Sequence, residues 1–289
     1  MEAFFDQSVP WYLVDVPPTN RAMRKLLVEY AGVDDSAAEK HITDIRSKAW
    51  RVAPFPCVGS FLFAELVLSN FPVYPEILAN LKSGTWTRYL EVGCGLGQDI
   101  RKLIHDGAPK TSVMGTDLLP GLLESGHDLF RDADALPLGK SLFAADFLDA
   151  SDANVLTAAG LDGTVDVIHA TMFLHCFDRP TQLVACQRIV SLLKQDKPGV
   201  MIVGKQGGVA NEALAREYPV KGPMGQAGGV VRTNFLHNVD SFKALWEEVG
   251  RATGTRWSVK VEEEEVMDRG YLYFNEEEHR WLSFVIEKL

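Results

Sequence analysis

Residues 89–117, YLEVGCGLGQDIRKLIHDGAPKTSVMGTD, decide the fold of this 289-residue chain. Tyr89–Val92 is a short apolar run typical of a buried strand, and residues 98–104 have the spacing of a helix. The turn between them holds three glycines at alternate positions, Gly93, Gly95 and Gly97. Glycines let the backbone turn sharply and let a ligand approach it, close to the positive end of the following helix. The stretch therefore predicts the opening of a nucleotide-binding βαβ unit.

Acidic residues stand on both sides of this glycine loop. A second strand candidate, residues 111–116, is followed by Asp117, which lies 20 positions after Gly97 (117 − 97) and can accept hydrogen bonds from both hydroxyls of a ribose. Dinucleotide enzymes require Gly-x-Gly-x-x-Gly, and Gln98 stands where the third glycine would fall. The order Glu91-x-Gly-x-Gly-x-Gly instead resembles motif I of the class I S-adenosylmethionine-dependent methyltransferases. That cofactor carries an ammonium and a sulfonium, so an acid such as Glu91 beside the loop is useful. A glycine turn without a ligand is the plainer alternative.

Composition limits the classes that remain. A chain with 46% hydrophobic residues can bury a full core. A net charge of −10 and a pI near 5.2 argue against a nucleic-acid partner, because no basic footprint is present. The four cysteines show neither Cys-x-x-Cys pairing nor zinc spacing, which favours free thiols and no metal. With no signal peptide and no apolar run long enough to span a membrane, we expect a cytoplasmic protein.

The chain divides into a helical cap at residues 1–83 and a methyltransferase domain at residues 84–289. In the cap we expect helices over residues 20–30, 35–50 and 59–70, and a short one starting at Pro75. Such a segment either closes the substrate pocket over the cofactor or serves as structural cover. Prolines and glycines at about residues 206–238 predict a lid-like insertion.

Alternating strand and helix patterns predict a Rossmann-like α/β fold with a seven-stranded, mostly parallel sheet. Its strands are expected at residues 89–92, 111–116, 142–147, 165–170, 199–204, 257–261 and 281–286, with helices between them. Ligands of such sheets bind at the carboxyl ends of the strands. The acidic run 262–265 is expected at a solvated sheet edge.

Residues after the second and third strands are expected to hold the adenosine part of the cofactor. In the methyltransferase scheme, Asp146 accepts from the adenine amine while Phe147 or Leu148 lies beside the ring; the plainer alternative is that Asp146 caps its own loop. Leu118 follows the ribose-binding acid, and His169 ends the fourth strand, which faces the sulfonium.

Several further runs resemble fungal methyltransferases of meroterpenoid pathways. They are SKAW at 47–50, APFPCVG at 53–59, GQDIR at 97–101, DVIHA at 166–170 and FLH at 173–175. The similarity extends from about residue 20 onward. Members of that family methylate the carboxylate of a prenylated polyketide acid, so the resemblance implies the same reaction class here, with cofactor positions at Asp117–Leu118 and Ala145–Asp146. It implies no particular catalytic base.

The acceptor group determines which side chains are needed. A carboxylate of pKa ~4 is already ionised at neutral pH, whereas a phenol of pKa ~10 gains from a base. A carboxylate substrate therefore predicts orienting donors, with His169 and His175 as catalytic candidates. Candidates for substrate contact are Trp50, Arg51, Phe173, Lys205 and His237. A histidine among apolar residues is commonly structural, and these aromatic residues can equally form core.

The prediction is an S-adenosylmethionine-dependent O-methyltransferase that acts on a hydrophobic small-molecule acid in fungal secondary metabolism, as a monomer or homodimer. Three alternatives stay open: a phenol O-methyltransferase, a cyclase or isomerase that retains the cofactor, and a binding protein without turnover. Product mass separates transfer from isomerisation.

Overall fold

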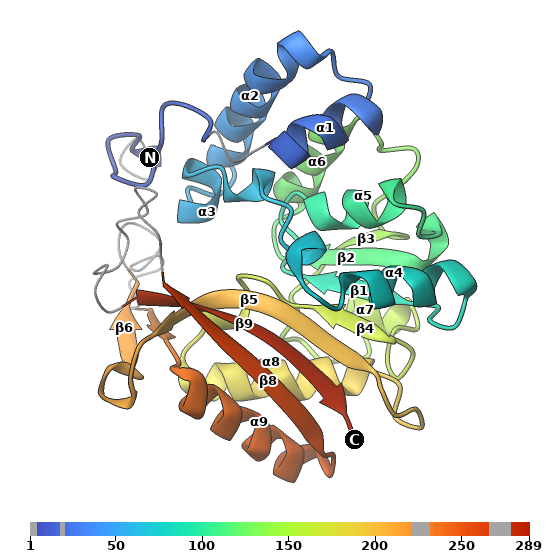
Figure 1. The fold of residues 1–289 in the computed structure, drawn as a ribbon, viewed down its shortest axis with the longest axis vertical. Coiled ribbons are helices and arrows are strands. Elements are labelled where there is room, and N and C mark those ends of the chain that lie inside the picture. The colour runs from blue at the N-terminus through green and yellow to red at the C-terminus, as the bar shows by residue number, and fades with distance from the viewer. Residues whose placement is uncertain (1–4, 18–20, 221–231, 266–278) are drawn as a thin grey trace.

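A computed structural model describes residues 5–17, 21–220, 232–265 and 279–289. Its main sheet has seven strands in the order β3-β2-β1-β4-β5-β9-β8. The strands are β1 (Tyr89–Val92), β2 (Val113–Asp117), β3 (Leu142–Ala144), β4 (Val167–His169), β5 (Met201–Val209), β8 (Trp257–Glu265) and β9 (His279–Lys288). The first five run parallel, and β9 is antiparallel to both of its neighbours (Figure 1). This order confirms the predicted seven-stranded, mostly parallel α/β fold.

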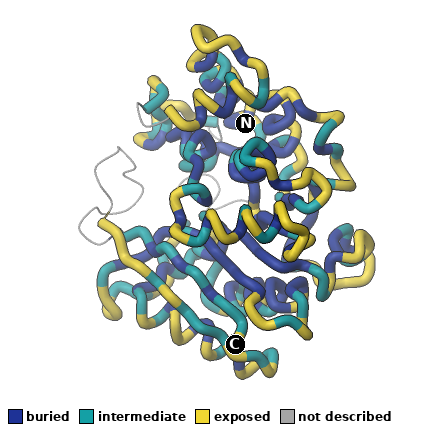
Figure 2. Tube along the Cα trace, turned by 45° about the vertical axis from the view of Figure 1, so that its right-hand side comes forward, coloured by how far each residue is buried: buried dark blue, intermediate teal, exposed yellow. Residues whose placement is uncertain are grey.

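Helices cover both faces of the sheet because its central strands are buried on both sides. One core packs strand residues such as Leu90 and Ile202 against α8 (Arg179–Leu192) and α9 (Val239–Thr253). The opposite core packs Tyr89 and Val203 against α4 (Tyr74–Ser83) and α5 (Gln98–His105). Figure 2 shows these buried strands in the middle of the molecule, with exposed residues concentrated on the outer helices and loops.

The residues before α4 form a helical cap with its own apolar core. Its helices are α1 (Arg21–Glu29), α2 (Ala38–Trp50) and the short α3 (Pro56–Gly59). Their buried side chains, including Met23 and Trp50, pack against Leu122 and Phe130 of α6 (Pro120–Phe130). The cap therefore rests on the β2 side of the sheet and lies across from β5, β8 and β9 (Figure 1).

One predicted helix of the cap is wrong. Residues 59–70 form the end of α3 and two 3-10 turns, η3 (Leu62–Ala64) and η4 (Leu68–Asn70). Phe61 has a left-handed backbone at φ 62°, and Glu65 is extended, so the chain bends twice where a helix would continue. The apolar side chains of this run are buried by packing against two separate cores.

The predicted insertion at residues 206–238 begins too early. Residues 206–209 belong to β5, which continues five residues past the predicted end at Gly204 because it pairs with β9 along its whole length. The insertion then contains η7 (Glu212–Leu214) and a two-stranded sheet of β6 (Glu217–Pro219) and β7 (Thr233–Phe235). Residues 221–231 lie outside the described part.

The third strand is also shorter than predicted. β3 ends at Ala144, so Asp146 and Phe147 lie in the loop that leads to α7 (Val155–Ala158), which Asn154 caps.

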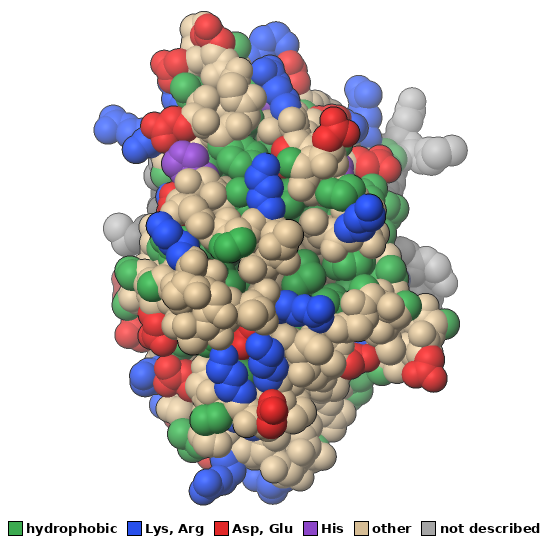
Figure 3. Space-filling model, turned by 90° about the vertical axis from the view of Figure 1, so that its right-hand side faces the viewer, with side chains coloured by type: hydrophobic (Ala, Val, Ile, Leu, Met, Phe, Trp, Pro, Cys, Tyr) green, Lys and Arg blue, Asp and Glu red, His purple; other side chains and the backbone are tan. Residues whose placement is uncertain are grey.

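Within the described ranges, no helix combines the length and the apolar character needed to cross a membrane. Basic and acidic side chains are interspersed over the face that Figure 3 presents.

Candidate active site

The conformation of the glycine loop is set by left-handed backbone angles and by close contact with its neighbours. Gly97 begins α5 with a left-handed backbone at φ 68°, and Gly93 has φ 63° with Phe173 so close that a Cβ would lie 2.8 Å from its ring. The Cys94 N–H donates to the Thr116 carbonyl on β2 at 3.0 Å. Only glycine combines these angles with this close contact, so the loop presents bare backbone at the end of β1.

A buried arginine holds the loop from below. Arg101 on α5 donates from Nη1 to the carbonyls of Leu96 and Gly97, at 3.1 and 3.3 Å. Its Nε and Nη2 each bind Asp132 at 2.9 Å, and the Tyr30 hydroxyl of the cap donates to the same carboxylate. Arg101 is fully buried, so the loop carbonyls, the acid and the cap are tied into one polar network.

Asp117 and Asp146 lie where adjacent strands β2 and β3 lead into loops. Asp117 accepts from the Gly95 N–H through Oδ2 and from the Leu119 N–H through Oδ1, both at 2.9 Å. Burial raises its pKa above the usual range of a carboxyl. Asp146 is exposed, and its Oδ1 accepts from the Leu148 N–H at 3.0 Å. The Ala145 N–H donates to the Asp117 carbonyl, which connects the two loops.

Two apolar residues flank these acids. Leu118 keeps 64% of its surface exposed beside Asp117. Phe147 is buried and meets Phe173 edge-on, with ring centres 5.2 Å apart. Leu118 can therefore cover a planar ligand, whereas Phe147 supports the loop from within.

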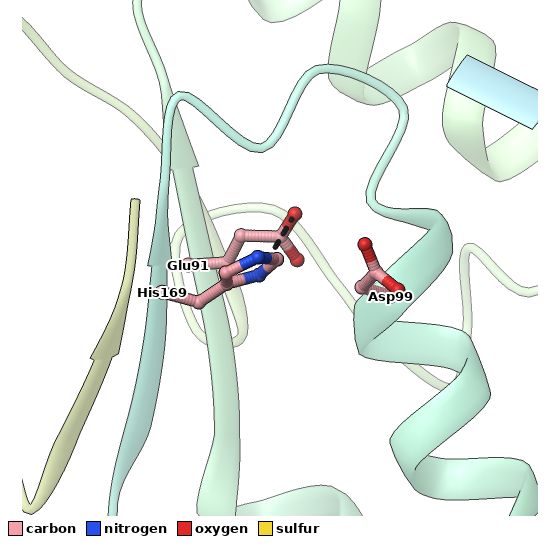
Figure 4. A group of neighbouring side chains, drawn as sticks. All are labelled: Glu91, Asp99 and His169. Carbon is pink, nitrogen blue, oxygen red and sulfur yellow. Dashed lines mark ion pairs between the residues drawn. The ribbon is translucent and has the colours of Figure 1, made fainter. Parts of the chain in front are cut away.

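Glu91, Asp99 and His169 form a buried cluster beneath the loop. Their ligand atoms lie within 4.8 Å of one another, so this group can hold a cation. Figure 4 shows Glu91 and His169 side by side, projecting from β1 and β4 toward α5, which carries Asp99; His169 Nδ1 is 3.6 Å from Glu91 Oε1. Burial raises the pKa of Glu91 well above its usual value and that of Asp99 to about 7. Burial also lowers the pKa of His169 to about 3, so its ring is uncharged at neutral pH.

Two members of the cluster also support neighbouring segments. His169 bonds to the Tyr89 hydroxyl through Nδ1 at 2.9 Å and to Thr171 Oγ1 through Nε2 at 2.6 Å. Asp99 accepts from the backbone N–H groups of Val67 and Leu68 in the cap, at 3.3 and 3.0 Å. The cap is thereby fastened to the start of α5.

Two orphaned oxygens in this region match the ammonium of S-adenosylmethionine. Glu91 Oε2 and Gln98 Oε1 are buried, and neither has a hydrogen-bond partner within the described part of the chain. Both residues line the same cavity. An ammonium has three N–H donors and a positive charge that favours the ionised form of Glu91. The residues present therefore fit the cofactor.

The cavity has a volume of about 670 Å³ and lies between the cap and the sheet. Its floor includes Glu91, Gly93, Gly95, Thr171 and Met172. The cap wall is mainly apolar and includes Cys57, Val58, Leu62, Phe63, Val67, Phe71, Pro72 and Val73. The opposite wall comes from β5, β8 and β9 and includes Lys205, Lys260, Glu262, Glu264, Glu265, Trp281 and Ser283. The cavity can therefore take a molecule that is apolar on one side and polar on the other.

Of the predicted substrate residues, Lys205 lines this cavity and the other four do not. Trp50 is buried in the cap, where its indole N–H donates to the Phe5 carbonyl, and Arg51 is exposed on the cap surface. His237 is fully buried between Gln182 and Ser241, and burial lowers its pKa to about 3. Phe173 supports Gly93 from below.

The predicted catalytic histidines also lie outside the lining. His175 accepts from the Gly207 N–H at 2.9 Å, and burial lowers its pKa to about 4. Gln98, Thr171 and Met172 line the cavity, although the sequence did not single them out as site residues. The position of Gln98 directly after the third glycine was the one signal available for it. Glu262, Glu264 and Glu265 lie on an exposed edge strand, as expected, and also line the cavity.

Comparisons with known proteins agree with this geometry. Residues 11–64 match the family model of the meroterpenoid methyltransferase N-terminal domain, and residues 90–196 match that of a methyltransferase domain. The O-methyltransferase phiE of Fungal sp. strain ATCC 74256 is 38% identical, over 90% of this chain and 81% of its own. The O-methyltransferase atr3 of Stereocaulon alpinum is 36% identical, over 89% of this chain and 69% of its own.

A third relative and a solved structure extend the comparison. The asnovolin E/chermesin D methyltransferase nvfJ of Aspergillus novofumigatus is 32% identical, over 83% of this chain and 80% of its own. The crystal structure of the N-terminal domain of EvdMO1 with SAH bound superposes with a TM-score of 0.51 at 16% identity, covering 86% of this chain and 97% of that one, which shows the fold. The chain is therefore a member of the fungal meroterpenoid methyltransferase family and an S-adenosylmethionine-dependent O-methyltransferase of class I fold.

Proposed function

We propose that the enzyme methylates a carboxylate oxygen of a hydrophobic small-molecule acid, such as a prenylated polyketide acid, in fungal secondary metabolism. The observation that carries this proposal is the cavity itself, which joins Glu91 and the glycine loop to an apolar cap wall and to the Lys205 ammonium. The apolar wall suits a prenyl chain, and the lysine suits a carboxylate. The relative named for asnovolin E and chermesin D supports a small-molecule substrate.

The cofactor is proposed to lie along the carboxyl ends of β1, β2 and β3. Glu91 and Gln98 would bind the ammonium, and the bare backbone of Gly93, Gly95 and Gly97 would permit close approach. Asp117 would accept from the ribose hydroxyls. A carboxylate offers about four acceptor sites, and backbone N–H groups occupy two of those of Asp117, which leaves two for the hydroxyls.

The adenine end belongs to the loop after β3. Asp146 would accept from the exocyclic amine, with Leu118 over the ring and with Ala145 and the backbone of Phe147 beside it. The exposure of Asp146 and Leu118 leaves both able to reach a ligand. When bound, the cofactor supplies a methyl group on a sulfonium, which is already an excellent leaving group.

The low pKa values of His169 and His175 favour a carboxylate over a phenol as the methyl acceptor. A carboxylate of pKa ~4 needs no base, whereas a phenol of pKa ~10 gains from a base whose own pKa lies near the working pH. His169 and His175 have pKa values of about 3 and 4, far below that range. In this proposal both act uncharged as positioning groups, His169 through the Thr171 hydroxyl and His175 through the Gly207 N–H. The main task left to the protein is to orient the carboxylate and exclude water.

The test is incubation with methyl-labelled S-adenosylmethionine and a panel of prenylated aromatic acids and matched phenols, followed by mass spectrometry. The expected product is heavier than the acid by one methylene unit, about 14 Da, plus the extra mass of the label, and it loses the label on mild alkaline hydrolysis, which cleaves a methyl ester and spares a methyl ether. An Asp117→Ala variant serves as the control with a weakened cofactor site. A label that survives hydrolysis would replace the proposal with ether formation, and a product of unchanged mass would indicate a cyclase or isomerase.

A further inference from the structure

Three neighbouring strands present one polar face to the cavity, which we call the sheet platform and define as Lys205, Glu262, Glu264, Trp281 and Ser283. The register places Lys205 opposite Ser283 and Ser283 opposite Glu262, across β5, β9 and β8. The next row on the same face contains Trp281 and Glu264. Residues two apart on a strand share a face, so all five side chains point to the same side of the sheet. All five line the cavity.

The platform contains an ion pair between Lys205 and Glu264. Lys205 Nζ lies 2.6 Å from Glu264 Oε2, and the Ser283 hydroxyl donates to Glu264 Oε1 at 3.2 Å. The side chains are 26% and 51% exposed, so solvent and ligands reach the pair from the cavity. An exposed pair of this kind contributes little to stability and can exchange partners at small cost.

Lys205 stands beside the end of β4. Its carbonyl accepts from the Met172 N–H at 2.7 Å, and its own N–H donates to Thr171 Oγ1 at 3.2 Å. Thr171 and Met172 line the cavity together with Glu91. The Lys205 backbone is therefore bonded to the junction between the cofactor floor and the polar wall, and its side chain lines the cavity beside the proposed position of the methyl acceptor.

The rest of the polar wall disfavours an anion. Glu262, Glu264 and Glu265 line it, against Lys205 and Lys260, and Lys260 Nζ lies 3.6 Å from Glu287 on the neighbouring strand β9. A substrate carboxylate elsewhere on this wall would face like charges. At Lys205 the carboxylate meets an opposite charge, but this lysine is already paired with Glu264.

We infer that Glu264 is a competitor that sets the affinity for the substrate: the substrate carboxylate takes Lys205 from it, and Glu264 recovers Lys205 once methylation has removed the substrate's charge. This inference rests on the proposed carboxyl methylation. Both ligands of the lysine are carboxylates before the reaction, so they exchange on similar terms. The methyl ester is neutral and keeps only a weaker carbonyl acceptor. Lys205 thus favours acids over esters at the same position, and the need to displace Glu264 lowers the affinity for both, so the ester product leaves readily.

The experiment measures KM for an accepted acid at saturating cofactor, together with inhibition by its methyl ester, in Lys205→Met, Glu264→Gln and the double variant. We expect KM to rise about tenfold or more in Lys205→Met, the scale of one charge-assisted hydrogen bond. In Glu264→Gln we expect KM and the ester inhibition constant to fall severalfold, because the competitor is gone. Glu264→Gln should have no such effect in the Lys205→Met background.

The controls separate this inference from the proposed function. Lys40→Met and Asp44→Asn break an ion pair of the same 2.6 Å length on α2, outside the cavity lining, and should leave KM unchanged. Calorimetry should find the affinity for S-adenosylhomocysteine unchanged in both platform variants. If the wild type methylates no acid, the proposed function fails. If the wild type methylates the acid while Lys205→Met keeps its KM, or Glu264→Gln raises it, the competitor role is overturned alone.

Discussion

The glycine loop and the sheet platform lie on opposite sides of the cavity, and the ion pairs that belong to them differ in how far they are exposed to solvent. Beneath the glycine loop, Arg101 and Asp132 form an ion pair whose side chains are 1% and 5% exposed. Across the cavity, Lys205 and Glu264 are 26% and 51% exposed. The first pair is enclosed by further hydrogen bonds to the loop carbonyls and to Tyr30, whereas the second shares only the Ser283 hydroxyl among the contacts described above.

This difference matches the tasks of the two sides. The cofactor has the same shape in every catalytic cycle, so a fixed frame can be built for it in advance, and preorganised polar groups need no rearrangement at the moment of reaction. Both molecules change charge and leave after each turnover, but the acceptor loses its charge at the carboxylate that Lys205 is proposed to bind, whereas the cofactor keeps the ammonium and ribose that the frame is proposed to bind. A solvated pair that exchanges partners suits that side better than a buried pair, which resists any change.

The largest expected effect comes from breaking the buried pair. Arg101→Met leaves the Asp132 carboxylate buried without its cation and should lower the free energy of unfolding by about 3 to 5 kcal/mol. Urea denaturation followed by circular dichroism measures this change. Lys40→Met, which breaks an exposed pair on α2, is the matched control and should cost at most about 1 kcal/mol. Equal losses in the two variants would remove the contrast between the two sides.

The second effect concerns cofactor binding. Asp117→Ala removes the proposed acceptor of the ribose hydroxyls and should weaken the binding of S-adenosylmethionine by about 1 to 3 kcal/mol. Titration calorimetry gives the affinity, and a thermal melt shows whether the loop that Asp117 ties through the Gly95 N–H survives. Asp149→Ala is the control, since that exposed acid bonds to Ser151 in its own loop. Unchanged affinity in a folded Asp117→Ala protein would contradict the ribose assignment.

The third effect is pH dependence on the cofactor side. Burial raises the pKa of Asp99 to about 7, so Asp99 loses its negative charge as the pH falls through neutrality, and burial also raises the pKa of Glu91 well above its usual value. A cationic ligand binds the ionised forms, so affinity should rise with pH by up to about tenfold per unit for each coupled proton. Protons should be released on binding, which calorimetry in buffers of different ionisation enthalpy detects.

The platform should show no such pH dependence. The bond from Lys205 lowers the pKa of Glu264, so Glu264 stays ionised from pH 6 to 8. Since pH 6 already lies about two units above the usual pKa of a carboxyl, the substrate KM should be constant over this range.

The stability of the free protein should respond to Asp99 with the opposite sign. Because the folded-state pKa lies above the unfolded value, the folded state holds this proton more tightly, and its contribution to stability is lost as the pH rises from about 4 to about 7. Asp99→Asn removes that loss and still offers an oxygen to the cap N–H groups. The binding prediction has its own contrary outcome. If the cofactor affinity of the wild type does not change between about pH 4 and pH 7, then Glu91 and Asp99 are already ionised before the cofactor binds.

The cofactor side could be predicted from the sequence because its parts are consecutive. The strand, the glycines and Asp117 lie within 29 residues, and local spacing sets their positions. The bounds of β1 and the start of α5 agree with the prediction from this stretch, and α5 ends one residue later than predicted. In the sequence, Gln98 indicates only a departure from the glycine pattern of dinucleotide enzymes. Its buried oxygen without a hydrogen-bond partner is a property of the folded loop, so the sequence does not reveal it.

The platform and the cap turns could not be predicted, because long-range packing determines them. Lys205 and Glu264 are 59 positions apart, and they meet only because β9 inserts between β5 and β8. In the cap, the apolar run at 59–70 has the composition of a buried helix. Its actual path depends on the left-handed backbone of Phe61 and on the two N–H groups that Asp99 draws toward α5.

The smallest expected effect sharpens the comparison most. Lys205→Met and Glu264→Gln should each change the free energy of unfolding by less than about 1 kcal/mol, because both partners keep contact with water when the pair is broken. The measurement is the same urea denaturation used for Arg101→Met, so the two sides of the cavity are compared on one scale. A small loss of stability combined with a large change in KM means that Lys205 and Glu264 serve recognition. A loss as large as that of Arg101→Met would instead make the platform pair part of the frame, and an exchangeable partner for the substrate would then have to be sought elsewhere on the polar wall.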